Sequence, residues 1–240
     1  MQGYQADLTY IHDVGFGDYG RKAAPGLLRI LRACGVKEGW VVDLGCGSGH
    51  WARELNRAGY KVLGVDQSPA MIRLARRKAP ASKFKVASFL AVKLPPCDAI
   101  TSIGECLNYR FDERNSRAAL VRLFARAYRA LRPGGVFIFD VAGPARFSPK
   151  MPQESWREGR DWAVMVSSSV DRQFLRRQII AFRKVGKLYR RSEEAHHLQL
   201  YRPSLLVAAL AQCGFDARTV REYGGIPLPP GITGILAVKP

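Results

Sequence analysis

Short apolar runs alternate with amphipathic stretches over the first 140 residues of the chain. Runs such as Trp40–Leu44 have the length of buried strands, whereas stretches such as His50–Ala58 repeat apolar residues at helical spacing. Glycine closes several stretches, as Gly59 does here. The pattern predicts strands over 40–44, 61–65, 84–87, 98–103 and 136–140, and helices over 25–33, 50–58, 68–78 and 115–131.

The pattern changes after Pro152, where strand-type alternation replaces the strand–helix rhythm. Apolar and polar residues alternate over 162–170, 174–184 and 188–201, with short polar turns between them. Helical spacing returns over 203–213, and two further strands are expected near 217–220 and 235–238. This order predicts an α/β fold: a doubly wound, seven-stranded Rossmann-like sheet with an inserted antiparallel β roof.

A chain of 240 residues is long enough to bury one core, so we expect a single domain over 1–240. Residues 1–35 would form an N-terminal lid and a first helix, and 36–149 the first part of the core. Residues 150–202 would form the roof strands, and 203–240 would complete the core. The longest apolar runs are too short to cross a bilayer and no secretory signal is visible, so we expect a cytoplasmic protein.

Charge is the unusual part of the composition. The chain carries 38 basic and 20 acidic residues, a net charge of +18, which would suit a polyanionic partner such as RNA. The basic residues recur on helix faces, for example at Arg73, Arg76 and Arg122, without a basic tail or an interleaved aromatic ladder. Solvated surfaces are therefore favoured, with a nucleic-acid groove and acidic small substrates as alternatives. The five cysteines form no C-x-x-C pair, and no metal site is predicted.

The loop after the first strand carries the clearest chemical signal. Gly45-Cys-Gly-Ser-Gly49 lets a backbone approach a ligand closely, at the sheet edge where open α/β folds bind ligands. Asp43, just before this loop, suits a ligand with an ammonium and a sulfonium and would oppose a pyrophosphate. Asp66, at the end of the second strand, can accept two hydrogen bonds from ribose hydroxyls. Together they indicate an adenosyl ligand with an amino-acid tail.

At these motifs the chain resembles the class I S-adenosylmethionine-dependent methyltransferases. The resemblance rests on Val41–Gly49, Gly64–Met71 and Leu131–Gly135, and covers roughly residues 36 to 140. It implies a methyltransferase that uses S-adenosylmethionine and acts on a small-molecule acceptor, by N- or O-methylation.

The resemblance also implies a set of cofactor residues. The methionine part of the cofactor would lie among Asp43, Gly45, Cys46, Gly47 and Gly49, the ribose on Asp66, and the adenine beside Gln67 and Met71. One departure is visible after the third strand, where many members of the family carry an acidic residue and this chain has Ala87-Ser88-Phe89. Ser88 could contact the adenine and Phe89 could pack on it, although a plain core role for Phe89 is equally compatible.

Catalytic candidates follow the fourth strand, in Ser102–Tyr109. In the family this segment faces the methyl group, which makes Gly104 a cofactor contact and Glu105, Asn108 and Tyr109 pocket residues. A surface position or helix capping is the alternative for Glu105. In the roof, period-two alternation puts Glu194 and His196 on one face. His196 and His12 are candidate bases, with polar packing as the alternative, and the roof residues Trp162, Glu194 and His196 are expected to meet the acceptor.

Three other functions remain as alternatives. A nucleic-acid methyltransferase is supported by the charge, but no Asn/Asp-Pro-Pro-aromatic segment follows the fourth strand. A noncatalytic module that keeps the S-adenosylmethionine site would share the same motifs. A nicotinamide oxidoreductase is disfavoured by Asp43. The sequence does not indicate an oligomeric state.

Overall fold

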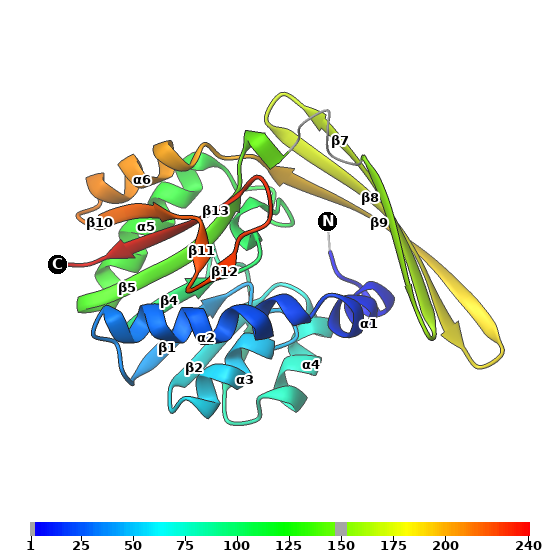
Figure 1. The fold of residues 1–240 in the computed structure, drawn as a ribbon, viewed down its shortest axis with the longest axis horizontal. Helices are drawn as coiled ribbons and strands as arrows, with labels where there is room; N and C mark the ends of the chain where they lie inside the picture. The colour runs from blue at the N-terminus through cyan, green and yellow to red at the C-terminus, as the bar shows by residue number, and fades with distance from the viewer. Residues whose placement is uncertain (1–2, 147–152) are drawn as a thin grey trace.

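A seven-stranded mixed sheet forms the centre of the molecule in the computed structural model, which describes residues 3–146 and 153–240 (Figure 1). The strand order is β10-β13-β5-β4-β1-β2-β3. Strands β3, β2, β1, β4 and β5 are parallel, whereas β13 runs antiparallel to both β5 and β10. The predicted fold class is confirmed. The strand bounds are β1 Trp40–Leu44, β2 Lys61–Asp66, β3 Lys83–Val86, β4 Cys97–Ser102, β5 Leu131–Ala142, β10 Asp216–Val220 and β13 Ile232–Val238.

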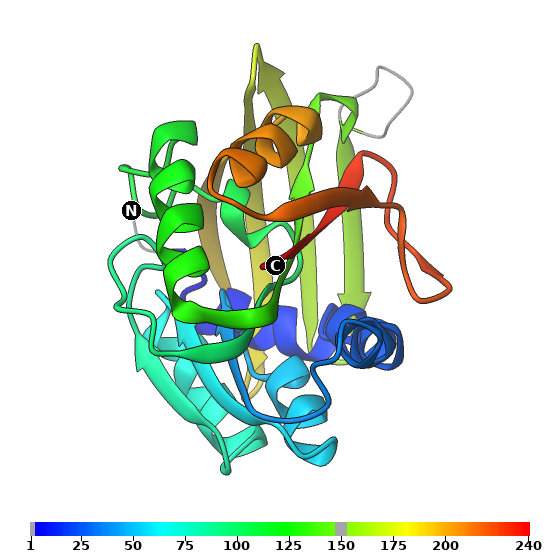
Figure 2. The same cartoon turned by 90° about the vertical axis from the view of Figure 1, so that its left-hand side faces the viewer.

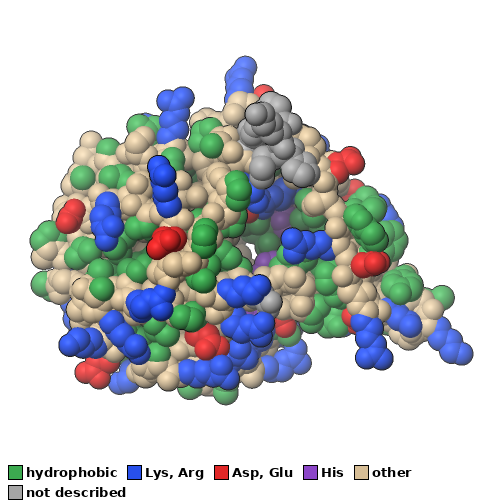
Figure 3. Space-filling model, in the orientation of Figure 1, with side chains coloured by type: hydrophobic (Ala, Val, Ile, Leu, Met, Phe, Trp, Pro, Cys, Tyr) green, Lys and Arg blue, Asp and Glu red, His purple; other side chains and the backbone are tan. Residues whose placement is uncertain are grey.

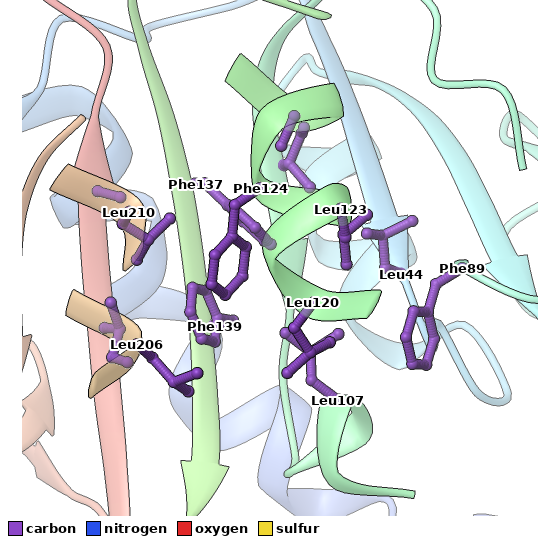
Figure 4. Close-up of a cluster of buried hydrophobic side chains, with 14 of the residues drawn as sticks. Leu44, Phe89, Leu107, Leu120, Leu123, Phe124, Phe137, Phe139, Leu206 and Leu210 are labelled. Atoms are coloured by element: carbon purple, nitrogen blue, oxygen red, sulfur yellow. The ribbon is translucent and has the colours of Figure 1, made fainter. Parts of the chain in front are cut away.

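Helices cover both faces of this sheet because its buried strands are apolar on both sides. Phe137 and Phe139 of β5 pack with Phe124 of α5 and with Leu206 and Leu210 of α6 (Figure 4). The alternate residues Val136 and Ile138 join a second cluster on the opposite face, with α2 and α3. The helices are α1 Ala6–Gly15, α2 Asp18–Ala33, α3 His50–Arg57, α4 Pro69–Lys78, α5 Arg117–Ala130 and α6 Pro203–Gln212.

A separate four-stranded antiparallel sheet, in the order β6-β7-β8-β9, stands beside the carboxyl ends of the central strands (Figures 1 and 2). Helix α1 lies between this sheet and the core. Leu8 and Ile11 of α1 pack against Trp162, Val164 and Ile179 of the sheet. The strand bounds are β6 Glu154–Gly159, β7 Trp162–Asp171, β8 Phe174–Val185 and β9 Leu188–Gln199.

Several elements differ from those expected. Helix α2 begins at Asp18 and continues through Pro25, held on both sides of the proline by buried residues such as Ala23 and Leu27. Strand β6 was not predicted because all its residues are exposed, so its sequence shows no alternation. A small hairpin, β11 Glu222–Tyr223 and β12 Ile226–Pro227, precedes β13 and was also not predicted. The expected start of the roof at 150 and the change of pattern at Pro152 lie outside the described residues.

No helix within residues 3–146 and 153–240 is both long enough and apolar enough to span a membrane.

Two glycines of α2 lie in contrasting surroundings. A Cβ added at Gly26 would come within 1.8 Å of the carbonyl oxygen of Tyr223, so α2 and the β11–β12 hairpin meet backbone to backbone at this point. At Gly20 the nearest atoms would be 3.8 Å or more away, which is ordinary contact. Only Gly26 is therefore required for packing.

We predict opposite effects on stability for the two alanine variants. Gly20→Ala should raise the free energy of unfolding by about 0.5–1 kcal/mol, because alanine restricts the unfolded chain and favours the helix. Gly26→Ala should lower it by about 1–3 kcal/mol, because the new methyl group must displace the hairpin. Urea unfolding of both variants measures this, and a stabilised Gly26→Ala variant would contradict the packing described here.

Candidate functional site

A cavity opens at the carboxyl ends of the central strands, where β1 lies between β2 and β4 and the following helices diverge to opposite faces. Its floor is the loop that follows β1. Gly47 has φ 53°, a left-handed conformation that favours glycine, and a Cβ added there would meet no atom within 4 Å. Gly49 also has positive φ, but its Cβ would lie 2.9 Å from Ala75 of α4. Gly47 therefore leaves the loop open to the cavity, while Gly49 allows α3 and α4 to pack.

Asp43 lies at the bottom of the cavity, below this loop. Its side chain is 3% exposed, and its Oδ1 accepts a hydrogen bond of 2.8 Å from the Thr101 hydroxyl. Burial and, to a lesser extent, the nearby charge of Asp66 raise the pKa of Asp43 to about 7, against the opposing effect of the Thr101 hydrogen bond. Asp43 can therefore change its charge near neutral pH.

Asp66, the last residue of β2, lies on the other side of the glycine loop and is hydrogen-bonded to it. Its Oδ2 accepts from the Gly47 amide at 2.9 Å, and its Oδ1 accepts from the Ser68 amide at 2.8 Å. Burial raises the pKa of Asp66, although these backbone hydrogen bonds oppose the shift. The two carboxylates predicted from the sequence thus lie on one cavity, as expected.

Most of the other predicted cofactor residues also line this cavity. They are Gly45, Cys46, Gly47, Gln67, Met71, Phe89 and Gly104. Phe89 lines the cavity and is also part of the core, since it is 6% exposed and belongs to the cluster that includes residues of α5. Ser88 is absent from the lining: its hydroxyl donates to Asp112 at 2.6 Å and accepts from the Leu90 amide at 3.1 Å. Gly49 is absent as well, for the packing reason given above.

The segment around α1, which was expected to form a lid, borders the cavity. Tyr4, His12, Phe16 and Tyr19 all line the cavity. His12 is deeply buried, which lowers its pKa to about 4, and its Nδ1 has no hydrogen-bond partner within the described part of the chain. The lid therefore presents a neutral imidazole with a free nitrogen.

Aromatic rings enclose one end of the cavity. Tyr109 stacks on Phe111 with ring centroids 4.9 Å apart, and its hydroxyl lies 3.3 Å from that of Tyr4. His196 stands behind these rings, 1% exposed, with Nε2 2.9 Å from Oε2 of Glu194. Tyr109 lines the cavity, as predicted, whereas His196 does not.

Glu105 points away from the cavity lining and toward the four-stranded sheet. Its Oε1 accepts a hydrogen bond from Arg177 of β8, which also donates to the Tyr109 hydroxyl at 3.1 Å. Glu105 stands at the N-cap position of the short 3-10 helix Cys106–Asn108, but its side chain makes no capping hydrogen bond and does not line the cavity. Asn108 does not line the cavity either, because its side-chain amide donates to the carbonyls of Ala142 and Gln199. The carboxylate of Glu105 reaches the cavity only through Arg177 and Tyr109.

Asp140, at the end of β5, is a functional candidate that the sequence reasoning missed. It is fully buried and accepts from the Gly104 amide at 2.9 Å and from the Tyr223 hydroxyl at 3.0 Å. Burial raises its pKa to about 6, against the opposing effect of these hydrogen bonds. The sequence did offer a signal for it, because Asp140 ends the predicted strand 136–140 and ligands bind at the carboxyl ends of strands in such sheets. Asp140 fixes the loop that carries Gly104.

The roof shapes the cavity through the lid. Glu194 accepts hydrogen bonds from the backbone amides of Tyr4 at 2.7 Å and Gln5 at 2.8 Å, and Trp162 packs against Phe16 with ring centroids 6.1 Å apart. Trp162, Glu194 and His196 were expected to meet the acceptor, but none of them lines the cavity. A hollow between the core and the four-stranded sheet is visible in Figure 3, with histidine atoms at its wall.

Among the described residues, no group of three or more His, Cys, Asp or Glu side chains is arranged to hold a metal ion.

Known proteins share both the sequence signals and the fold. Residues 41–135 match the model of a methyltransferase domain family. A putative methyltransferase of Geobacillus sp. is 32% identical over 106 residues, which make up 42% of this chain and 41% of that protein. The match therefore spans less than half of that relative.

Solved structures match over nearly the whole chain. An S-adenosylmethionine-dependent methyltransferase from Clostridium acetobutylicum has a TM-score of 0.82 at 18% identity, with 96% of each chain covered. The sugar N-methyltransferase KedS8 from Streptoalloteichus has a TM-score of 0.80 at 21% identity, covering 100% of this chain and 95% of that one. At these identities the structural matches show the fold alone.

The surroundings of Asp43 make its ionisation a direct test of the site. We expect its carboxyl to titrate near pH 7 in the folded protein. Thr101→Val should raise this pKa, because a hydrogen bond to the charged form is lost, and Asp66→Asn should lower it, because a neighbouring negative charge is removed. Carbon-13 NMR of the side-chain carboxyls measures all three values. An Asp43 that titrates near pH 4 in the native protein would show that the carboxyl is hydrated.

Proposed function

We propose that the chain is a class I S-adenosylmethionine-dependent methyltransferase and that it transfers the methyl group of this cofactor to a nitrogen or oxygen of a small molecule. The match of residues 41–135 to a methyltransferase domain family supports this proposal. The observation that carries the proposal is the shape of the site. One cavity runs from the Gly47 loop and the two carboxylates to the ring-walled end at Tyr4, Tyr109 and Phe111. It offers a binding place for a cofactor at one end and for an acceptor at the other.

The residues at the glycine-loop end fit the cofactor. The empty space beside Gly47 admits a ligand against the backbone. The carboxylates of Asp43, which is buried, and of Asp66, which is half-buried, lack a cationic partner among the hydrogen bonds and ion pairs of the described residues. We assign Asp66 to the ribose hydroxyls and Asp43 to the positively charged methionine part. Gln67, Met71 and Phe89 would line the adenine.

The lid and the roof support a small acceptor rather than a polymer. Helix α1 covers the cavity from above, and the four-stranded sheet packs on the outer face of α1, so the acceptor end is enclosed by two layers. A matching structure, KedS8, is itself a sugar N-methyltransferase. An amine or hydroxyl compound of sugar size is the class of acceptor that these observations favour.

The bound cofactor would supply a methyl group already activated by a positive sulfur. The task of the chain is then to align the acceptor with this carbon and to receive the proton that the acceptor loses. Of the four catalytic candidates, His12 and Tyr109 line the cavity, whereas Glu105 and His196 lie behind it. His12 lines the cavity and its Nδ1 has no hydrogen-bond partner among the described residues, so this nitrogen is our candidate to accept the proton. Tyr109, oriented by Arg177, would hold the acceptor.

Calorimetry with S-adenosylmethionine, S-adenosylhomocysteine and NAD tests the cofactor assignment. The first two should bind and NAD should not. Asp66→Ala should weaken binding about 10- to 100-fold, since hydrogen bonds to a charged group are worth about 1.5–3 kcal/mol. Asp216→Ala, at an exposed position on β10, is the matched control. An unchanged dissociation constant in Asp66→Ala would exclude the ribose assignment.

Conversion of S-adenosylmethionine to S-adenosylhomocysteine, with methylation of an added amine or hydroxyl sugar, separates an enzyme from a noncatalytic binding module. With an acceptor found in this way, His12→Asn should lower kcat at least tenfold, since general bases typically contribute a factor of about 100 to 10,000. Its affinity for the cofactor should stay within a few-fold. His197→Asn, at an exposed position of β9, should leave kcat unchanged. Normal turnover in His12→Asn would assign the proton to water or to another group.

A further inference from the structure

Four polar side chains from four different elements meet beside the glycine loop. Asp13 of α1 accepts a hydrogen bond from Lys78, the last residue of α4, and its Oδ1 lies 2.9 Å from Nε2 of His50 at the start of α3. The Lys78 ammonium also lies 2.7 Å from His50 Nε2 and 3.4 Å from the hydroxyl of Ser48 in the loop. The carboxylate of Asp13, from the lid, thus lies among the side chains of Lys78, His50 and Ser48, which belong to the core.

This cluster is largely removed from water. The side chains of Asp13, His50 and Lys78 are 19%, 20% and 17% exposed. Burial alone would raise the pKa of Asp13, but hydrogen bonds from His50, Lys78 and Ser48 hold it well below its ordinary value. Burial likewise lowers the pKa of Lys78, and its contact with Asp13 opposes that shift. Contact with Asp13 therefore favours the charged form of Lys78 in this half-buried position.

The cluster borders the cavity at the end assigned to the amino-acid tail of the cofactor. Ser48 and His50 line the cavity, whereas Asp13 and Lys78 stand directly behind them. We propose that Lys78, His50 and Ser48 form a subsite for the carboxylate of the cofactor, and that Asp13 fills this subsite in the structure as an internal competitor. The inference rests on the proposed function, because the carboxylate is the one on the cofactor's methionine part.

An exchange of one carboxylate for another keeps the charges balanced. Lys78 never loses its counter-ion, so the main cost of binding is the movement of the Asp13 side chain. This arrangement predicts opposite signs for two substitutions that break the same ion pair. Removing the cation should weaken cofactor binding, whereas removing the competitor should strengthen it. An ion pair that only closes the lid would give the same sign for both.

The test compares two ligands by calorimetry: S-adenosylhomocysteine, which carries the carboxylate, and 5′-methylthioadenosine, which lacks the amino-acid tail. Lys78→Met should lower the affinity for S-adenosylhomocysteine about tenfold or more, as expected for a lost charged hydrogen bond. Lys78→Arg, which keeps the positive charge, should retain most of the affinity. Asp13→Asn should raise the affinity for S-adenosylhomocysteine several-fold. The dissociation constant of 5′-methylthioadenosine should change less than twofold in all three variants.

Two charge-matched controls keep the result specific. Arg77→Met removes an exposed cation one residue before Lys78 and should change neither ligand. Asp7→Asn removes the other acidic contact of α1, to Arg190 of the roof, and should affect both ligands alike if at all. Thermal unfolding confirms that each variant is folded.

Each outcome has one meaning. If Asp13→Asn and Lys78→Met shift the affinity for S-adenosylhomocysteine in the same direction, or if both ligands respond equally, the subsite is excluded while the proposed function stands. If the unmodified protein binds neither ligand, the proposed function itself fails and this inference fails with it.

Discussion

Helix α1 has one apolar face, and burial of that face against the four-stranded sheet creates the outer wall of the cavity. Leu8 and Ile11 would be exposed without Trp162 and Ile179 to cover them, and a helix of this length has little stability alone. The same packing puts Tyr4, His12 and Phe16 over the glycine loop. Because every lid contact with a ligand depends on it, the roof contributes to function without lining the cavity.

The parts of the site that could be predicted from the sequence are those made within short segments. Asp43, Gly47 and Asp66 lie at strand ends, and the strand order alone brings such ends together. Ser88 was misassigned because its partner, Asp112, lies 24 residues further along the chain. Glu105 was misassigned for the same kind of reason, since it pairs with Arg177 of the roof. Contacts between distant segments leave no periodic signal in the sequence.

Three carboxylates meet at the carboxyl edge of the sheet, and the energetics of one of them suit a cationic ligand. Burial raises the pKa of Asp43 to about 7 and that of Asp140 to about 6, and it also raises the pKa of Asp66. Each is therefore held in an environment that disfavours its charge. Of the three, Asp43 is the one that we assign to the positively charged methionine part of the cofactor. That ligand would favour the ionised form of Asp43, so part of the proposed binding free energy would come from offsetting the cost of burying this charge.

Helix α1 contacts the roof on one side and the core on the other, and the two sets of contacts differ in chemistry. This difference affects how ligands enter and leave. Toward the roof, α1 is held by an apolar cluster, by the Asp7–Arg190 pair and by Glu194 at the preceding backbone. Toward the core, its charged contact is the cluster at Asp13. We expect the second boundary to separate first. Helix and roof would then move together, and the rate of product release would depend on the cost of separating and hydrating the charges of Asp13 and Lys78.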